Sequence, residues 1–267
     1  MEGSYHERAN VDRASFIIYL QPLLVMKRDY HKWYSNHLGK DMELLVFGNK
    51  GSPVILFPTR TARFYDYENW KIIDSLASKI EAGNIQVFCI DSYDIESFYN
   101  QHCPPSKRIY NHLKYEQYII DELLPLIRLV NSSTFIIAAG CSLGAYHAVN
   151  IALRHPHLFG KIVGISGRYD LTTSADSFPD LFDGYIDERI IENMPSRYVP
   201  DCNNEVTLKL WRKLQLYFAV GKLDPFACNN LLLHQALMHK NVHNHLDFYD
   251  GEVHRCSYWR TMLPMYL

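Results

Sequence analysis

One serine stands in a sequence pattern that is typical of nucleophiles. The pattern Gly-x-Ser-x-Gly spans residues 140–144, GCSLG, with Ser142 at its centre. An apolar run at 135–139 precedes it, and small apolar residues recur at helical spacing over 145–153. Because glycines permit a sharp strand-to-helix turn, this layout predicts a nucleophile elbow that exposes the Ser142 hydroxyl and turns Cys141 inward. A solvated serine in a small-residue turn is the alternative.

A serine hydroxyl becomes a good nucleophile only with a base that accepts its proton and a carboxylate that orients the base. His254 is the expected base, because it follows the last predicted strand and the chain order Ser, Asp, His is typical of elbow serines. Asp224 is the expected acid, since its turn GKLDP follows the strand predicted at 214–220 and reaches the same sheet edge. Asp170, past the preceding strand, is the second candidate, and a purely local turn role for Asp224 stays open.

Four other histidines lie at less suitable positions. His147 and His155 fall on the predicted elbow helix, where histidines usually cap, pack or face solvent. His243 and His245 come too early, before the end of the last strand. None of the four is expected to be the base.

Attack of a serine on a carbonyl carbon produces an oxyanion, which needs two backbone N–H donors in a water-poor pocket. Leu143, the residue after the serine, is one expected donor. The second is expected from the loop at 59–63, TRTAR, with Thr59 favoured and Arg60 as the alternative.

Two arginines and two aromatic residues near predicted strand ends are the expected substrate contacts. They are Arg60, Arg63, Phe98 and Tyr99. The arginines would bind an acidic substrate group, with ion pairs to acidic residues such as Asp66 and Glu68 as the alternative. The aromatic residues would line an acyl or sugar site, with core packing as the alternative.

The elements that must position these residues follow from the hydrophobic pattern. Two early apolar runs at 42–48 and 53–58, separated by a loop signal, are expected to pair antiparallel. Further strands are predicted at 85–91, 135–139, 161–166, 214–220 and 245–249. Helical spacing recurs at 65–80, 115–130, 145–153 and 257–266. The alternation predicts an α/β fold with a mostly parallel, doubly wound sheet of about eight strands.

The length of 267 residues and the hydrophobic content of 48% suit one domain, 1–267, with a single large core. The segment at about 168–212, after the strand ending near Ser166, is longer than an ordinary connection in such a fold. We expect a lid-like insertion over the site, and a surface excursion that covers a sheet edge is the alternative.

Charge and cysteine usage exclude several classes of function. The formal net charge is −2 without a cluster of lysine and arginine, so no nucleic-acid partner is expected. The apolar run at 16–26 is too short to span a bilayer and is followed by Lys27, Arg28 and Asp29 rather than a small-residue cleavage site, so no membrane association is expected. The six cysteines form no C-x-x-C pair, which predicts reduced thiols with neither a zinc site nor a dense disulfide framework, and the missing cleavage site predicts a cytoplasmic location.

Three segments together resemble the Putative esterase family of the α/β-hydrolase superfamily, whose relatives include S-formylglutathione hydrolase, feruloyl and enterochelin esterases and mycolyltransferases. The segments are 34–40 (YSNHLGK), 140–144 (GCSLG) and 254–260 (HRCSYWR), the last similar to a His-x-x-x-x-Trp segment of the family. The resemblance implies the α/β-hydrolase fold, with Ser142 as nucleophile, His254 as base and Asp224 as acid. The loop after Pro58 lacks the family's His-Gly pair, so the resemblance does not assign the second oxyanion donor.

The leading hypothesis is a serine carboxylic-ester hydrolase that acts through an acyl-enzyme on a small or medium ester or thioester. An acyltransferase would use the same residues with an alcohol in place of water. A catalytically silent domain that serves as a binding or scaffold protein is the third hypothesis. The expected partner is a small-molecule ester, no metal or organic cofactor is expected, and a homo-oligomer stays open.

Overall fold

The computed structural model describes residues 26–175, 177–251 and 254–267. These residues form one sheet whose strands are β1 (Arg28–Ser35), β2 (Lys40–Phe47), β3 (Ser52–Phe57), β4 (Ile85–Ile90), β5 (Ile137–Cys141), β6 (Lys161–Ile165), β7 (Gln215–Gly221) and β8 (His245–Tyr249). Their order across the sheet is β1-β2-β4-β3-β5-β6-β7-β8. β2 runs antiparallel to both of its neighbours, and every pair from β4 to β8 is parallel. The predicted mostly parallel sheet is confirmed.

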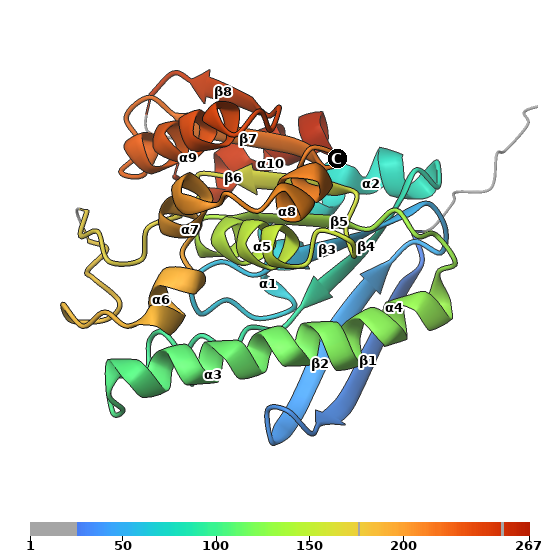
Figure 1. Cartoon of the computed structure of the whole chain (residues 1–267). Coiled ribbons are helices and arrows are strands. Elements are labelled where there is room, and N and C mark those ends of the chain that lie inside the picture. Colours follow the sequence, from blue (N-terminus) through green and yellow to red (C-terminus); the bar gives the residue numbers. More distant parts are fainter. Residues whose placement is uncertain (1–25, 176, 252–253) are drawn as a thin grey trace, which may run out of the picture.

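Helices cover both faces of the sheet (Figure 1). Those on one face are α1 (Asp66–Asn69), α2 (Ile72–Glu81) and α10 (Cys256–Tyr266). Those on the other are α3 (Pro105–Tyr118), the π-helix η1 (Ile119–Leu123), α4 (Leu124–Val130), α5 (Leu143–Arg154), α7 (Pro195–Asp201), α8 (Glu205–Trp211) and α9 (Ala227–His239). The short α6 (Glu188–Glu192) contacts α3 and α7. The result is a three-layer α/β/α arrangement.

The pairing predicted for the first two strand runs is wrong. β4 lies between β2 and β3, antiparallel to β2 and parallel to β3. Both runs are almost continuously apolar because these strands are buried on both faces, and a pattern without alternation does not specify a partner. The edge strand β1 has no counterpart among the predicted strands, because its polar sequence RDYHKWYS contains no apolar run.

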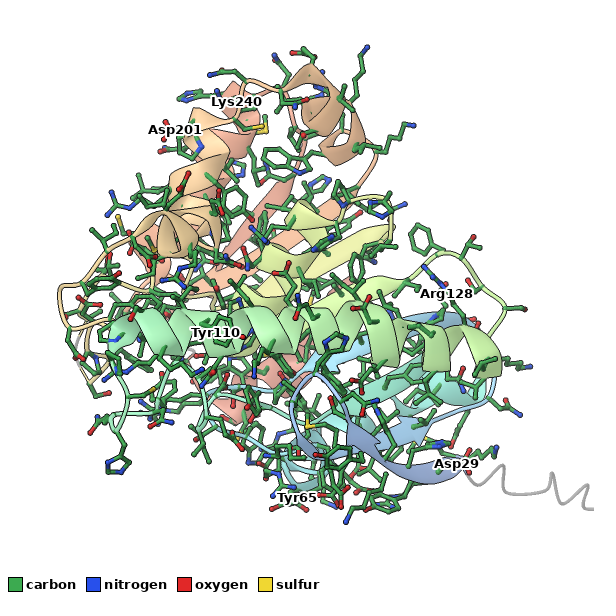
Figure 2. All side chains as sticks on the ribbon, turned by 60° about the horizontal axis from the view of Figure 1, so that its bottom comes forward. Asp29, Tyr65, Tyr110, Arg128, Asp201 and Lys240 are labelled. Atoms are coloured by element: carbon green, nitrogen blue, oxygen red, sulfur yellow. The ribbon has the colours of Figure 1, made fainter. Side chains whose placement is uncertain are left out.

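The helices α3, η1 and α4 follow one another as a long rod across the molecule, with Tyr110 on α3 and Arg128 on α4 (Figure 2). The sequence predicts only the later part, 115–130, because the first turns of α3 are rich in polar residues. The π-turn ends two residues before Pro125, whose ring nitrogen has no N–H for a regular helical hydrogen bond. The missing N–H of this proline therefore accounts for the irregular turn.

The winding of the chain brings two loops together at one sheet edge. From β3 the chain goes to β4 on one side, and it then continues to β5 on the other side of β3. At the carboxyl ends of these strands Phe57 lies opposite Gly140. The crevice outside such a reversal is where doubly wound sheets bind ligands. The loop after β3 and the turn after β5 are therefore placed side by side.

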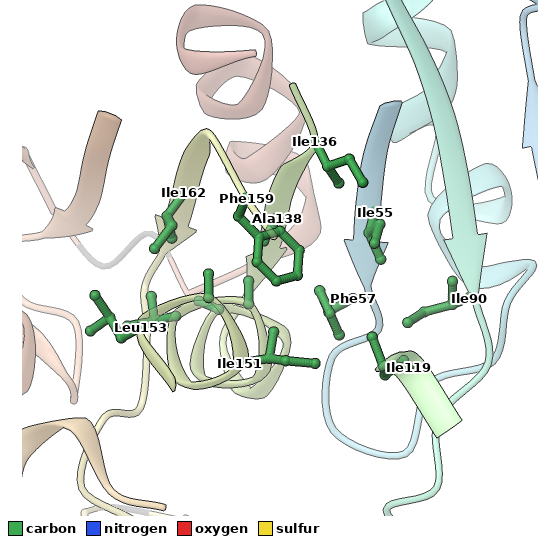
Figure 3. Packing of buried hydrophobic residues seen from close by; sticks show 14 of the residues in the cluster. Ile55, Phe57, Ile90, Ile119, Ile136, Ala138, Ile151, Leu153, Phe159 and Ile162 are labelled. Atoms are coloured by element: carbon green, nitrogen blue, oxygen red, sulfur yellow. The ribbon is translucent and has the colours of Figure 1, made fainter. Parts of the chain in front are cut away.

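The helix α5 rests on the centre of the sheet (Figure 3). Its Ile151 and Leu153 pack into the same buried cluster as Phe57, Ala138 and Ile162 of the strands. All of α5 except its last residue is buried. Each large apolar side chain removed from water in this way contributes about 1.5–3 kcal/mol to the stability of the fold. The packing of α5 therefore fixes the position of the turn that precedes it.

The segment predicted to be an insertion, 168–212, carries α6, α7 and α8. Five of its apolar side chains join a buried cluster with residues of α3, α5 and the loop after β4: Leu171, Leu181, Phe182, Ile190 and Met194. Trp211 Nε1 donates to the Leu153 carbonyl of α5 at 2.7 Å. The segment thus lies against both ends of α5, and its opening as a lid stays a prediction.

In the part of the chain that the structure describes, no helix has the length and apolar content needed to cross a membrane. The same residues contain no group of three or more His, Cys, Asp or Glu side chains arranged to hold a metal ion. All six cysteines are free thiols. The short apolar run predicted at 16–26 lies, apart from Met26, outside the described residues.

Candidate active site

The turn between β5 and α5 holds Ser142 in an unusual backbone conformation, with φ 56° and ψ −119°. Such a conformation costs a residue other than glycine about 1–3 kcal/mol, and it persists only where its surroundings fix it. The Ser142 N–H donates to the Ile165 carbonyl of β6 at 2.8 Å. A Cβ at Gly140 would lie 2.3 Å from the Gly144 backbone, and a Cβ at Gly144 would lie 2.3 Å from the Phe57 carbonyl oxygen. Both glycines of the pattern are therefore required by close backbone approach.

Three of the predicted residues meet in hydrogen-bonding contact. His254 Nε2 lies 3.0 Å from Ser142 Oγ, and His254 Nδ1 lies 3.0 Å from Asp224 Oδ2. The other carboxylate oxygen, Asp224 Oδ1, accepts the Phe226 N–H at 2.9 Å, which fixes the carboxylate plane. The Asp224 side chain is fully buried, whereas 10% of the His254 side chain is exposed. A hydroxyl, an imidazole and a carboxylate thus lie in the order that serine activation requires.

Aromatic rings enclose the imidazole of His254. The rings of Phe178, Phe226 and Trp259 lie at centroid distances of 5.3, 5.5 and 5.6 Å from it. They shield the imidazole from water, which strengthens its hydrogen bonds in the lower local dielectric. A cavity of about 370 Å³, lined in part by Trp70, Phe178 and Trp259, opens on Ser142 and His254. Its size suits a small ligand.

Backbone donors lie beside the serine. Leu143 is the first residue of α5, so its N–H has no acceptor within the helix. Thr59 and Arg60 follow β3 and line the same cavity as Ser142. The Ala62 N–H donates to the Thr59 carbonyl at 3.0 Å and thereby fixes the start of this loop. The use of Leu143, and of Thr59 or Arg60, by an oxyanion stays a prediction.

A buried carboxylate that the sequence analysis missed holds the same loop. Asp94, which is 1% exposed, accepts the Thr61 N–H at 3.2 Å through Oδ2, and its Oδ1 lies 3.0 Å from His147 Nε2. His147 packs on the elbow helix, between the rings of Phe57 and Phe98. The position of Asp94 just past the carboxyl end of β4 was a signal for it, because this edge of the sheet collects the functional loops.

The Arg63 guanidinium is engaged by two carboxylates of the sheet. Its Nε donates to Asp91 Oδ1 and its Nη2 to Glu43 Oε2, both at 2.7 Å. Burial raises the pKa of Asp91, and the Arg63 charge partly offsets this effect. The acids predicted as ion-pair partners are therefore wrong: Asp66 accepts only the Arg63 backbone N–H, at 2.8 Å, and Glu68 pairs with another arginine.

The remaining predicted residues lie in different surroundings. Phe98 is buried among rings of α3, α5 and the insertion. Tyr99 is half-buried, and its hydroxyl contacts Arg60. Asp170 accepts hydrogen bonds from the N–H and hydroxyl of a threonine in its own loop, at 2.9 and 2.6 Å. Cys141 is buried, burial raises the pKa of its thiol, and its predicted inward packing is confirmed.

The sheet order and the elbow define the chain as an α/β-hydrolase. The sequence model of the family described as "Putative esterase" matches residues 35–267. The chain belongs to this family, and ester hydrolysis is the activity that this membership indicates. A search among curated proteins found no match.

Solved structures of esterases share the fold. A ferulic acid esterase superposes with a TM-score of 0.70 at 18% sequence identity, covering 90% of this chain and 95% of its own. An S-formylglutathione hydrolase from Agrobacterium tumefaciens gives a TM-score of 0.69 at 16% identity, over 90% of this chain and 92% of its own. The fluorophosphonate-binding serine hydrolase F of Staphylococcus aureus gives 0.65 at 18% identity, over 90% and 96%. These likenesses establish the α/β-hydrolase fold.

Proposed function

We propose that the chain is a serine carboxylic-ester hydrolase that acts through an acyl-enzyme on a small or medium ester or thioester. The observation that carries the proposal is the pair of 3.0 Å contacts that link Ser142 through His254 to Asp224. Membership of the esterase family supports the same reaction class independently of this geometry.

The first half of the reaction forms the acyl-enzyme. With Asp224 accepting from His254 Nδ1–H, the lone pair of Nε2 faces the Ser142 hydroxyl and takes its proton as Oγ attacks the ester carbonyl carbon. The carbonyl oxygen becomes an oxyanion that the N–H of Leu143 stabilises together with that of Thr59, or of Arg60 as the alternative. The carbon–oxygen bond to the leaving group then breaks, and His254 gives the proton to the departing alcohol or thiol.

The second half regenerates the enzyme. Water enters the cavity, His254 Nε2 removes a proton from it, and the resulting hydroxide attacks the acyl carbon bound to Ser142 Oγ. The bond to Oγ breaks, and the serine takes its proton back from His254 as the carboxylic acid leaves. Each step uses side chains of this chain and water, so the proposed reaction requires no metal or organic cofactor. The cytoplasm stays the expected location of the enzyme.

The test is hydrolysis of p-nitrophenyl esters from acetate to octanoate by the wild type and by Ser142→Ala. We expect the wild type to release p-nitrophenolate and Ser142→Ala to lose at least about a thousandfold in kcat, because the nucleophile is gone. Ser132→Ala, an exposed serine in the loop before β5, is the matched control and should keep full activity. Equal rates for the wild type and Ser142→Ala would exclude the proposed nucleophile.

A further inference from the structure

Two arginines lie one aromatic ring away from the catalytic imidazole. The Arg60 guanidinium carbon is 5.3 Å from the centroid of the Phe178 ring, and that of Arg168 is 5.6 Å from the Phe226 ring. Both rings contact His254, at 5.3 and 5.5 Å between centroids. The positive charges therefore flank the reacting centre without touching it.

The two guanidinium groups meet at one phenol. The Tyr99 side chain lies close enough to both Arg60 and Arg168 for each guanidinium charge to act on its hydroxyl. Burial raises the pKa of Tyr99, and the two arginine charges only partly offset this, so the phenol stays neutral and cannot compensate them. Two like charges beside one neutral oxygen repel each other, and a bound anion would relieve that repulsion.

Neither guanidinium has a carboxylate partner among the residues that the structure describes. The ion pairs among the described residues include those of Arg63 with two carboxylates. None of them involves Arg60 or Arg168. Asp170 and Asp180 attract Arg168 from a distance, but their oxygens accept hydrogen bonds from neighbouring N–H and hydroxyl groups. Arg60 therefore has no ion-pair partner within the described ranges, and the charge of Arg168 is balanced only from a distance.

The two arginines differ in access. Arg168 is 2% exposed, and its Nη2 donates to the carbonyls of Leu171, Thr173 and Pro179. Its Nε and Nη1 have no acceptor in hydrogen-bonding geometry within the described ranges. Arg60 is exposed and lines the cavity that holds Ser142. Arg60 can thus contact a substrate directly, whereas Arg168 acts through its charge.

We propose that the cavity selects esters that carry a carboxylate in the acyl chain or in the alcohol, with Arg60 contacting that carboxylate and Arg168 supplying a second, buried positive charge. This proposal rests on the proposed ester hydrolysis and names its substrate class. A guanidinium binds a carboxylate through two parallel N–H donors, which a neutral ester of the same shape cannot match.

The experiment compares charged and neutral esters of equal length. On the acyl side, the mono-p-nitrophenyl esters of succinate, glutarate and adipate are compared with p-nitrophenyl butanoate, pentanoate and hexanoate. On the alcohol side, 4-acetoxybenzoate is compared with 4-acetoxybenzamide. We expect the wild type to prefer the anion by about tenfold or more in kcat/KM in at least one series, and salt at about 0.5 M to reduce that preference.

The variants assign the preference to one side chain. Arg60→Gln should lower kcat/KM for the preferred anionic ester by about 10–100-fold more than for its neutral counterpart, because only the anion loses its guanidinium partner. Arg60→Lys should keep part of the preference, and Arg128→Gln, on the distant end of α4, should keep all of it (Figure 2). No anionic preference in either series, or equal losses for charged and neutral esters in Arg60→Gln, overturns the proposal.

Failure of the proposed hydrolysis is distinguishable from failure of the charge selection. If the wild type cleaves neither kind of ester, the hydrolase proposal fails. The proposed selection of a carboxylate is then tested by binding instead of by rates. Calorimetry then compares Ser142→Ala with the double variant carrying Arg60→Gln, using the mono-anilide of glutarate and the anilide of pentanoate. Tighter binding of the anion that is lost in the double variant supports the proposal, and equal or undetectable binding of the two anilides overturns it.

Discussion

Asp94 offers a prediction about how the loop beside the nucleophile is held. Its carboxylate is buried and serves two donors at once, the Thr61 N–H at 3.2 Å and His147 Nε2 at 3.0 Å. In Asp94→Asn the amide oxygen can serve one donor, but the amide N–H₂ faces the other and forces the imidazole into its opposite tautomer. The substitution therefore keeps the size and shape of the side chain but weakens the hydrogen bonds that hold the 59–63 loop.

The size of the effect follows from these two bonds. Hydrogen bonds to a charged group contribute about 1.5–3 kcal/mol, against about 0.5–1.5 kcal/mol for neutral ones. We expect Asp94→Asn to lower the free energy of unfolding by about 1–2 kcal/mol. Loss of one oxyanion donor costs about 100–1,000-fold in kcat, so a loosened loop should cost part of that, about 10–100-fold, with KM little changed.

The assay measures kcat and KM on one p-nitrophenyl ester together with urea unfolding. Asp187→Ala is the matched control, because Asp187 also accepts a backbone N–H, that of Ile190 at 3.0 Å, but as the N-cap of α6 and away from the 59–63 loop. The control should keep its activity within about twofold while losing a similar amount of stability. The reasoning is refuted if Asp94→Asn and the control lose stability alike and both keep kcat.

Three further predictions concern the acid, the elbow and a buried histidine. Asp224→Asn should lower kcat by about ten-thousandfold without unfolding the protein, because His254 Nδ1–H loses its charged partner, as steady-state kinetics and circular dichroism can check. Gly144→Ala should destabilise the fold by about 1–3 kcal/mol in urea, although alanine normally favours helices, because its Cβ would lie 2.3 Å from the Phe57 carbonyl oxygen. Burial, with a neighbouring histidine, lowers the pKa of His112 from 6.5 to about 3, so only the unfolded state gains a proton between these values. Stability should therefore fall as the pH drops from 6.5, by about 2 kcal/mol at about pH 5, and His112→Gln should remove that slope in unfolding curves.

Each of these predictions has a contrary outcome. An unchanged kcat in Asp224→Asn would mean that the carboxylate does not orient the base. A gain in stability for Gly144→Ala would mean that α5 can accommodate a Cβ at this position without a clash with the Phe57 carbonyl oxygen. An undiminished slope below pH 6.5 in His112→Gln would assign the acid sensitivity of the fold to other groups.

The parts of the site that the sequence predicts are those encoded locally or by chain order. The turn around Ser142 is encoded within five residues, because Gly140 is required by the approach of Gly144 in the same turn, while Gly144 is required by the end of β3. His254 and Asp224 could be placed because parallel strands deliver the loops after them to one edge of the sheet, so a position just past a strand is already a position near the serine. Their contact in the structure follows from that rule, while their catalytic roles stay proposals.

The parts that the sequence does not predict depend on distant partners. The neighbour of β2 is β4 rather than β3, and nothing in two continuous apolar runs specifies this order. The ion pairs of Arg63 reach to β2 and to Asp91 just after β4, whereas Asp66, near it in sequence, accepts only its backbone N–H. Asp94 was missed for the same reason, since its partners lie on the loop after β3 and on α5. Such contacts become visible only when the strands are in place.

The most direct test of the account is the site of covalent labelling by a fluorophosphonate probe, read by intact mass and peptide mapping of the folded protein. We predict one adduct per chain, on Ser142, with labelling strongly slowed in His254→Ala because the base no longer takes the hydroxyl proton. Folded wild type without an adduct, or an adduct on another residue, would contradict the assignment of Ser142 as an activated nucleophile.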